Sequence, residues 1–292
     1  MGAAARMRAL AVIATVGLML CAGCGPDEQT EASPKPIRSY VAIGDTFTAA
    51  PYAGASVVTD HCRRAKQNYP ARVADKLKIK KVRDVSCPGA DVKAITKKYK
   101  KDGHRLVAQM KAVKRSTGLV TVQAGAYASD LYQNLADFCA PDSTTKCALS
   151  ALAAGVPRVI APIRQQLGAA VRKIGDRAPD AEIVIVGYPR HVGKHTSCPA
   201  LSDMSKTDRK VWVQIDKRLN LAMAQAARDT GVDFVDVYGA SKRHGICDKV
   251  PWVRPARTIH SRGVALGPTE AGEKAMAKLI VATVGADRRL GD

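Results

Sequence analysis

A hydroxyl side chain follows directly on a short apolar run near the start of the chain. Residues 40–46 read Tyr-Val-Ala-Ile-Gly-Asp-Thr, and a hydroxyl at the end of a buried strand can act as a nucleophile when a base removes its proton. Thr46 supplies the hydroxyl, but its methyl group restricts χ1 and crowds the direction of attack. Asp45 is expected to hold the turn through its side chain rather than to catalyse. Chemistry at Thr46 therefore depends on the groups that other segments bring to it.

Three later segments can supply such groups. Residues 86–90 read Ser-Cys-Pro-Gly-Ala, in which the Gly89 amide could donate to an oxyanion, although this glycine also suits a disulfide-anchored turn. The run 118–123 continues into Ala-Gly-Ala-Tyr-Ala, which places Tyr127 after a second strand. Residues 266–272 read Leu-Gly-Pro-Thr-Glu-Ala-Gly and indicate the start of a helix.

Together these segments resemble the sequence blocks of the SGNH (GDSL) esterase and lipase family. In that family a serine attacks an ester carbonyl, a glycine amide and an asparagine side chain hold the oxyanion, and a histidine removes the serine proton. The resemblance places Thr46 at the serine, Gly89 at the glycine, Tyr127 at the asparagine and Gly267 at the histidine. Val264 stands where an acidic residue would orient that histidine. The resemblance therefore implies a site that has lost three of its four chemical groups.

Two alternatives would restore part of this site. Pairing Ser129 and Asp130 with the family's Asn-Asp requires a two-residue insertion, so we expect the asparagine to be lost. The phenol of Tyr127 can donate one hydrogen bond, but its length is expected to carry the hydroxyl to another part of the pocket. Among the six histidines, His260 is the candidate for a substitute base because it lies seven residues before Gly267.

The N-terminal segment indicates export. Two arginines precede an apolar run over residues 9–20, which is too short to span a bilayer as a mature helix. The run ends in small residues before Cys24, which resembles a bacterial lipobox and implies lipid attachment to that sulfur. An ordinary secretory signal is the alternative, so we expect a lipoprotein on the outer face of the cytoplasmic membrane or a secreted protein. The predicted organisation is a lipoprotein signal peptide (1–23), a flexible tether (24–37), one folded domain (38–285) and a tail (286–292).

Six cysteines follow Cys24, and in an oxidising compartment they suggest three disulfides, for which the sequence alone allows 15 pairings. The resemblance is to secreted bacterial family members with three disulfides. It implies the sequential pairs Cys62–Cys87, Cys139–Cys147 and Cys198–Cys247. The spacing of cysteines and histidines does not suggest a zinc site, and neither a metal nor a cofactor is implied.

Apolar runs alternate with helical periodicity along the folded segment. We predict strands over residues 40–43, 82–85, 119–122, 183–186 and 234–237. Helical stripes cover 156–174 and 212–226, with Pro157 and Pro162 expected to interrupt the start of the first, and Thr269 is expected to begin a C-terminal helix. This alternation predicts one α/β domain with a parallel sheet of about five strands flanked by helices. The resemblance implies the same SGNH-hydrolase-like, flavodoxin-like architecture.

Basic residues are concentrated in one segment. The formal net charge is +20, and residues 63–115 carry 18 Lys and Arg against four Asp. Outside the cytosol such a region would attract anionic membrane surfaces or wall polymers. It lacks the interleaved aromatic residues of a nucleic-acid platform, so nucleic acid is not expected. A solvated basic face that serves only solubility is the alternative, and no feature sets the oligomeric state.

Three hypotheses for function follow. The first is an exported, catalytically degenerate SGNH-fold protein whose cleft binds an acyl, ester or glycan ligand or an envelope partner. The second is an active ester hydrolase that uses Thr46 with an unrecognised base. The third is a structural envelope protein that binds anionic polymer through region 63–115.

Overall fold

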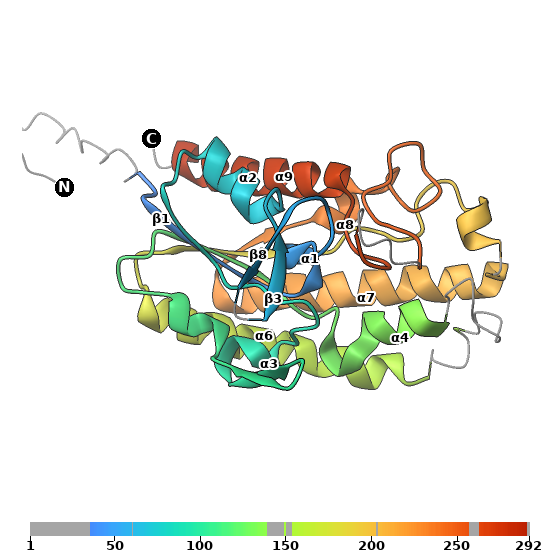
Figure 1. The fold of residues 1–292 in the computed structure, drawn as a ribbon, viewed down its shortest axis with the longest axis horizontal. Coiled ribbons are helices and arrows are strands. Elements are labelled where there is room, and N and C mark those ends of the chain that lie inside the picture. Colours follow the sequence, from blue (N-terminus) through green and yellow to red (C-terminus); the bar gives the residue numbers. More distant parts are fainter. Residues whose placement is uncertain are drawn as a thin grey trace, which may run out of the picture.

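A computed structural model gives the fold of the chain (Figure 1). It describes residues 36–59, 61–138, 149, 154–202, 204–256 and 263–290. The predicted signal peptide, the predicted lipidation site Cys24 and residues 24–35 of the predicted tether lie outside the described residues.

A five-stranded parallel sheet forms the centre of the molecule, in the order β4-β1-β7-β8-β9. Each neighbouring pair of strands is parallel, and β1 lies between β4 and β7. The strands are β1 (Ser39–Gly44), β4 (Lys81–Asp84), β7 (Leu119–Gln123), β8 (Glu182–Val186) and β9 (Asp233–Val235). The predicted parallel sheet of about five strands is confirmed.

The last strand ends earlier than the sequence pattern predicts. β9 stops at Val235, two residues before the predicted end, because Asp236 caps the short helix α8 (Val237–Ala240). The Asp236 side chain accepts a hydrogen bond of 2.8 Å from the Gly239 amide, and a capping aspartate of this kind turns the chain out of the extended conformation.

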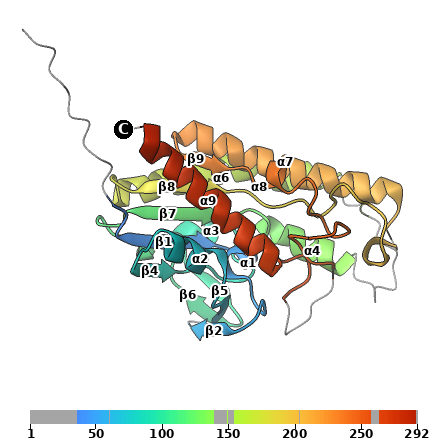
Figure 2. The same ribbon diagram turned by 90° about the horizontal axis from the view of Figure 1, so that it is seen from above.

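Helices cover both faces of the sheet (Figures 1 and 2). In β1, Tyr40 and Ala42 join the apolar cluster under α2 and α9, whereas Val41 and Ile43 join the cluster under α6 and α7. Successive side chains of a strand point to opposite faces, so a strand buried on both sides reads as a continuous apolar run. The helices that cover the sheet are α2 (Tyr69–Lys76), α6 (Val156–Arg177), α7 (Lys206–Thr230) and α9 (Glu270–Leu290).

Helix α6 continues through both of its prolines, contrary to our expectation. Pro157 lies in the first turn, where a backbone N–H would have no partner within the helix. Pro162 lies inside the helix but on its exposed face, where water can bond the carbonyl that the proline leaves free. The opposite stripe, which includes Ile163 and Leu167, is buried and holds the helix in place.

The smaller elements connect the main layers. Two antiparallel hairpins, β2–β3 and β5–β6, lie beside the β4 edge of the sheet (Figure 2). The small elements are α1 (Thr46–Ala49), β2 (Ser56–Thr59), β3 (Cys62–Ala65), α3 (Lys93–Thr96), β5 (Tyr99–Lys101), β6 (His104–Leu106), η1 (Gln109–Ala112), η2 (Ala128–Asp130), α4 (Leu131–Phe138) and η3 (Pro199–Leu201).

Two of the three predicted disulfides are present in the described residues. Cys62–Cys87 joins β3 to the loop after β4, and Cys198–Cys247 joins the segment before η3 to the loop after α8. The third predicted pair, Cys139–Cys147, lies outside the described residues. A native disulfide of this loop length typically stabilises a domain by about 2–4 kcal/mol, and each bridge restrains the two segments that it joins.

The C-terminal helix α9 begins at Glu270, one residue after the predicted start signal at Thr269. The domain boundary predicted after residue 285 falls inside this helix. Among the residues that the structure describes, no helix combines the length and the apolar character that crossing a membrane requires.

Candidate active site

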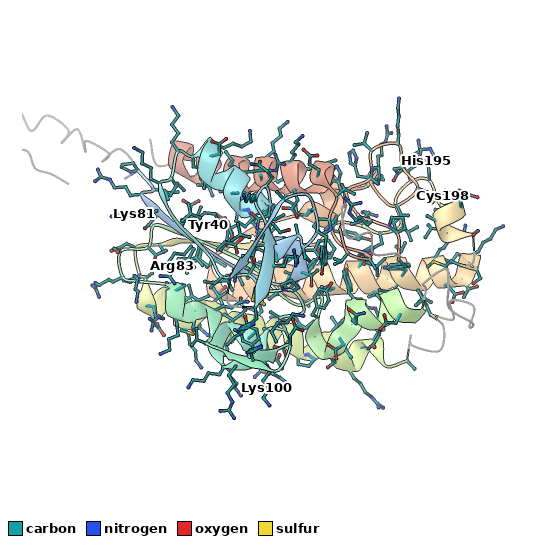
Figure 3. All side chains as sticks on the ribbon, in the orientation of Figure 1. Tyr40, Lys81, Arg83, Lys100, His195 and Cys198 are labelled. Atoms are coloured by element: carbon teal, nitrogen blue, oxygen red, sulfur yellow. A yellow bond between two sulfur atoms is a disulfide. The ribbon has the colours of Figure 1, made fainter. Side chains whose placement is uncertain are left out.

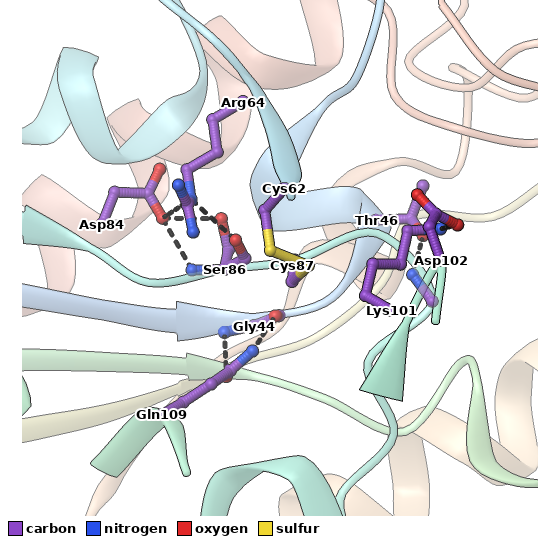
Figure 4. Close-up of a disulfide and its surroundings, with 11 residues drawn as sticks. Gly44, Thr46, Cys62, Arg64, Asp84, Ser86, Cys87, Lys101, Asp102 and Gln109 are labelled. Atoms are coloured by element: carbon purple, nitrogen blue, oxygen red, sulfur yellow. Dashed lines mark hydrogen bonds and ion pairs between the residues drawn. A yellow bond between two sulfur atoms is a disulfide. The ribbon is translucent and has the colours of Figure 1, made fainter. Parts of the chain in front are cut away.

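The turn after β1 is fixed by hydrogen bonds to its neighbours. The Gly44 amide donates to Gln109 Oε1 (3.1 Å), and Gln109 Nε2 donates to the Gly44 carbonyl (2.9 Å; Figure 4). The Asp45 amide donates to the Gln123 carbonyl of β7 (3.2 Å). A Cβ on Gly44 would lie 2.0 Å from Thr48 Oγ1, so only glycine allows α1 to fold back this closely against the strand.

Asp45 holds this turn, as expected. It caps α1: its Oδ1 accepts from the Phe47 amide (2.9 Å), and its Oδ2 accepts from the Tyr188 hydroxyl (2.5 Å). Burial raises the pKa of the Asp45 carboxyl to about 7, although the Tyr188 hydroxyl and the Phe47 amide lower it in part. Burial disfavours the charged form of a carboxylic acid. In the folded domain Asp45 can therefore keep its proton well above the pH at which an aspartate ordinarily loses it.

Thr46 and Gly89 come together, as the resemblance implies. The Gly89 amide donates to Thr46 Oγ1 at 2.9 Å. Gly89 adopts a positive φ of 78°, and the neighbouring Cys87 anchors its loop through the disulfide to Cys62 (Figure 4). The donor that should receive an oxyanion therefore already bonds the hydroxyl that stands at the nucleophile position.

Tyr127 also reaches this site, contrary to our expectation that its length would carry the hydroxyl elsewhere. The side chain is buried, and its phenol lies close enough to Thr46 for the threonine side chain to lower the pKa of Tyr127. The reason lies in the turn after β7, where the Ala128 amide donates to the Gly125 carbonyl (3.1 Å) and redirects the chain. Burial, with a smaller contribution from Asp45, raises the pKa of Tyr127 above its usual value, so the phenol stays neutral.

The alternative alignment through Ser129 and Asp130 finds no support in the structure. Both residues are exposed and have positive φ angles, of 47° and 53°. Tyr127 is buried near Thr46, so its assignment to the position of the family's asparagine stays our prediction.

The loop at Gly267 lacks both an imidazole and the space for one. The Gly267 amide donates to the Val264 carbonyl (3.1 Å), and its own carbonyl accepts from the Arg254 amide (2.9 Å). A Cβ at Gly267 would lie 2.7 Å from Val264 Cγ2, closer than real Cβ contacts allow. A histidine at this position therefore requires a change at Val264 as well.

A buried histidine, which the sequence analysis passed over in favour of His260, lies beside this loop. His191 is fully buried, with Nδ1 at 3.1 Å from Asp216 Oδ1 and Nε2 at 3.2 Å from the Leu266 carbonyl. Its ring centroid lies 6.2 Å from that of Phe47, which follows Thr46. The His191 network thus connects the Gly267 loop to α1.

His191 cannot serve as the missing base in this arrangement. Its Nδ1 is bonded to Asp216 and its Nε2 to the Leu266 carbonyl, and neither ring nitrogen makes a hydrogen bond to Thr46. Asp216 also accepts from the Tyr132 hydroxyl (2.8 Å). The one feature of the sequence that could have indicated this network is Asp216, a carboxylate on the apolar stripe of α7. A buried charge requires a partner, so a partner such as His191 could have been sought. His260, the predicted substitute base, lies outside the described residues.

The arrangement can bind a carbonyl group but is poorly equipped to activate a nucleophile. Thr46 Oγ1 accepts a hydrogen bond from the Gly89 amide, and no histidine or carboxylate of the described residues bonds this hydroxyl. Within the same residues, no group of three or more His, Cys, Asp or Glu side chains is placed to hold a metal ion.

Comparison with known proteins identifies the family of the chain. The model of the GDSL-like Lipase/Acylhydrolase family matches residues 42–275. Lipase 1 of Streptomyces coelicolor is 27% identical over 260 residues, which cover 88% of this chain and 91% of that protein. Phospholipase A1 from Streptomyces albidoflavus has a similar fold (TM-score 0.69, 24% identity, 85% of this chain and 99% of that one). An extracellular lipase from Streptomyces rimosus gives a TM-score of 0.66 at 25% identity, over 84% of this chain and 98% of that one. Since the family match spans most of its length, the chain belongs to the GDSL-like lipase/acylhydrolase family.

Proposed function

We propose that this protein is an exported, catalytically degenerate member of its family that binds an ester, acyl or glycan ligand, or an envelope partner, without efficient turnover. One observation carries the proposal: the Gly89 amide, the expected oxyanion donor, is hydrogen-bonded to Thr46 Oγ1. A substrate carbonyl would have to displace that bond before any attack. Ligand binding needs only a receptive surface and hydrogen-bond donors such as the Gly89 amide, and it does not need an activated nucleophile.

The size of the expected loss supports this reading. Loss of a general base typically lowers the rate by about 10²–10⁴-fold, and loss of one oxyanion donor by about 10²–10³-fold. In this chain Gly267 stands at the position of the general base, and Tyr127 stands at the position of the asparagine that donates to the oxyanion. The two effects are not additive once the catalytic unit is broken, but either one alone makes ester hydrolysis slow.

The relatives support the ligand class and the export. Lipases and a phospholipase act on acyl esters, so a cleft inherited from such proteins fits an acyl or ester group. One solved relative is described as extracellular, and disulfides such as Cys62–Cys87 persist in oxidising compartments. We extend this to lipid attachment at Cys24, which would hold the domain at the outer face of the cytoplasmic membrane.

A second candidate function rests on the basic region. Lys81 and Arg83 of the edge strand β4 and Lys100 of the β5–β6 hairpin are exposed (Figure 3). Exposed cations of this kind attract anionic membranes or wall polymers with a strength that falls as the salt concentration rises. Salt-sensitive binding to such a surface that Thr46→Ala leaves unchanged would favour this structural role over ligand binding in the cleft.

The reactivity of Thr46 tests the main proposal. A fluorophosphonate probe labels an activated hydroxyl by forming an Oγ–P bond while fluoride leaves, and this requires a base to take the proton. We expect intact-mass spectrometry to show no probe adduct on this protein, with Lipase 1 of Streptomyces coelicolor as the labelled control. A stoichiometric adduct that maps to Thr46 would instead support the alternative of an active threonine-dependent esterase.

A further inference from the structure

The β5–β6 hairpin has two faces with different surroundings, because successive side chains of a strand point to opposite sides. Tyr99 and Leu106, which are partners in the register of the two strands, pack against the apolar cluster around the disulfide that joins β3 to the loop after β4. His104, two residues before Leu106, stacks on His61 of the β2–β3 connection, with ring centroids 3.5 Å apart. This inner face anchors the hairpin to the domain.

The outer face of the hairpin, which consists of Lys100 and Arg105, is cationic. The two residues are partners in the register, so their side chains stand opposite each other on neighbouring strands. Both are exposed, neither forms an ion pair with a described residue, and Lys100 points away from the domain (Figure 3). The carboxylate of the connecting turn, Asp102 Oδ1, lies 3.3 Å from Lys101 Nζ instead. Like charges in such a pair destabilise a hairpin, and an anionic surface placed against them would remove the repulsion.

Exposed apolar side chains lie beside these cations. Val107, which follows β6 directly, is 67% exposed. Val57 of β2 and Val82 of the edge strand β4 are also exposed. Three of the five large apolar side chains that are exposed among the described residues thus lie on these neighbouring elements (Figure 2). Cations alone suit any polyanion, whereas cations with exposed apolar groups beside them suit a surface that offers both negative charge and hydrocarbon.

We propose that the outer face of the β5–β6 hairpin is a docking surface for an anionic lipid bilayer. Lys100 and Arg105 bind lipid phosphates, and Val107 enters the boundary between the head groups and the acyl chains. This inference rests on the second candidate function and deepens it, because it names the bilayer as the partner and the hairpin as the element that contacts it. A wall polymer of phosphates offers no hydrocarbon layer for Val107 to enter.

The test measures co-sedimentation of the soluble protein lacking residues 1–24 with phosphatidylcholine vesicles that do or do not contain phosphatidylglycerol. All helices and strands of the described fold begin after residue 38, so this protein keeps the hairpin but lacks the predicted signal peptide and lipid anchor. We expect binding to the anionic vesicles only, with a strength that falls as the salt concentration rises.

Variants of the hairpin locate the docking surface. Lys100→Gln/Arg105→Gln should weaken vesicle binding about thirtyfold, since each cation at an anionic membrane contributes a factor of about five. The matched control Lys217→Gln/Arg218→Gln removes the same two residue types from exposed positions of α7, which packs at the opposite, β9 edge of the sheet (Figure 2). It should change the affinity less than about twofold. Val107→Ser should weaken vesicle binding about fivefold, because it removes an apolar contact, and should leave binding of soluble polyphosphate unchanged.

Three results would overturn the docking surface: no binding to the anionic vesicles, equal weakening by the two double variants, or unchanged vesicle binding by Val107→Ser. Polyphosphate separates a failure of this inference from a failure of the candidate function on which it rests. Binding to polyphosphate but not to vesicles would leave the basic region as a polyanion-binding face and reject only the bilayer. Binding to neither would reject both. The fluorophosphonate test of Thr46 does not depend on any of these results.

Discussion

A variant with Thr46→Ser, Tyr127→Asn, Val264→Asp and Gly267→His is expected to hydrolyse p-nitrophenyl butyrate at least about 10²-fold faster than the unmodified protein, because it regains both a base and an oxyanion donor. The proposed site keeps the contact between Thr46 and Gly89, and the buried Tyr127 lies close to it. The measurement is the release of p-nitrophenol by the purified variant.

The change at Val264 is needed for steric as well as chemical reasons. A Cβ at Gly267 would lie 2.7 Å from Val264 Cγ2. Aspartate has a single γ-carbon, which can take the rotamer that leaves this space free, and its carboxylate can orient the new imidazole. A control variant that carries the other three substitutions but keeps Val264 should therefore gain less activity than the quadruple variant.

Thr46→Ser alone separates the missing base from the missing nucleophile. We expect no rate gain, because serine without a base is a poor nucleophile. A clear gain from this single change would contradict the account and indicate another base, with His260 as the first residue to test. Circular dichroism spectra of all variants establish that they remain folded, which matters because Tyr127 is a buried side chain.

Asp45→Asn is expected to make the stability of the domain less dependent on pH. Burial raises the pKa of Asp45 to about 7 in the folded state, whereas an aspartate in an unfolded chain titrates near pH 4. Between these values the folded state binds one more proton than the unfolded state. The free energy of unfolding therefore falls by about 1.4 kcal/mol per pH unit as pH rises through this window, or about 4 kcal/mol in all.

The measurement is urea unfolding of wild type and variant at pH 4.5, 5.5 and 6.5. Asp84 and Glu273, whose pKa values burial also raises, contribute a slope of the same sign to both proteins. The difference in slope between wild type and Asp45→Asn therefore reports the contribution of the Asp45 proton alone. The exposed control Asp180→Asn should keep the wild-type slope. Equal slopes in wild type and Asp45→Asn would show that Asp45 is already ionised in the folded domain.

The sheet and its covering helices could be predicted because their signals are local. The spacing of apolar residues predicts the strand at 40–43 and the helical stripe at 212–226. The structure contains both elements, and their apolar residues are buried. The interruption expected at Pro162 was wrong because tertiary packing of Ile163 and Leu167 outweighs one lost hydrogen bond. Local propensity competes with packing, and here packing prevails.

The chemical site was predictable only where a motif marks it. Thr46 and Gly89 lie in motifs, and the structure brings them into contact. His191 and Asp216 carry no such spacing, and their contact depends on how α7 packs against the loop after β8. His61 and His104 likewise stack only because the β2–β3 and β5–β6 hairpins lie side by side. Contacts between distant segments follow from the fold and not from any local pattern.

The most direct measurement is hydrolysis of short and medium p-nitrophenyl esters by the soluble protein lacking residues 1–24, beside its Thr46→Ala variant. The account predicts equal rates for the two proteins, because Thr46 has no base in the described structure and the Gly89 amide is already bonded to it. Activity that is present in the wild type and lost in Thr46→Ala would contradict the account and establish a threonine-dependent esterase.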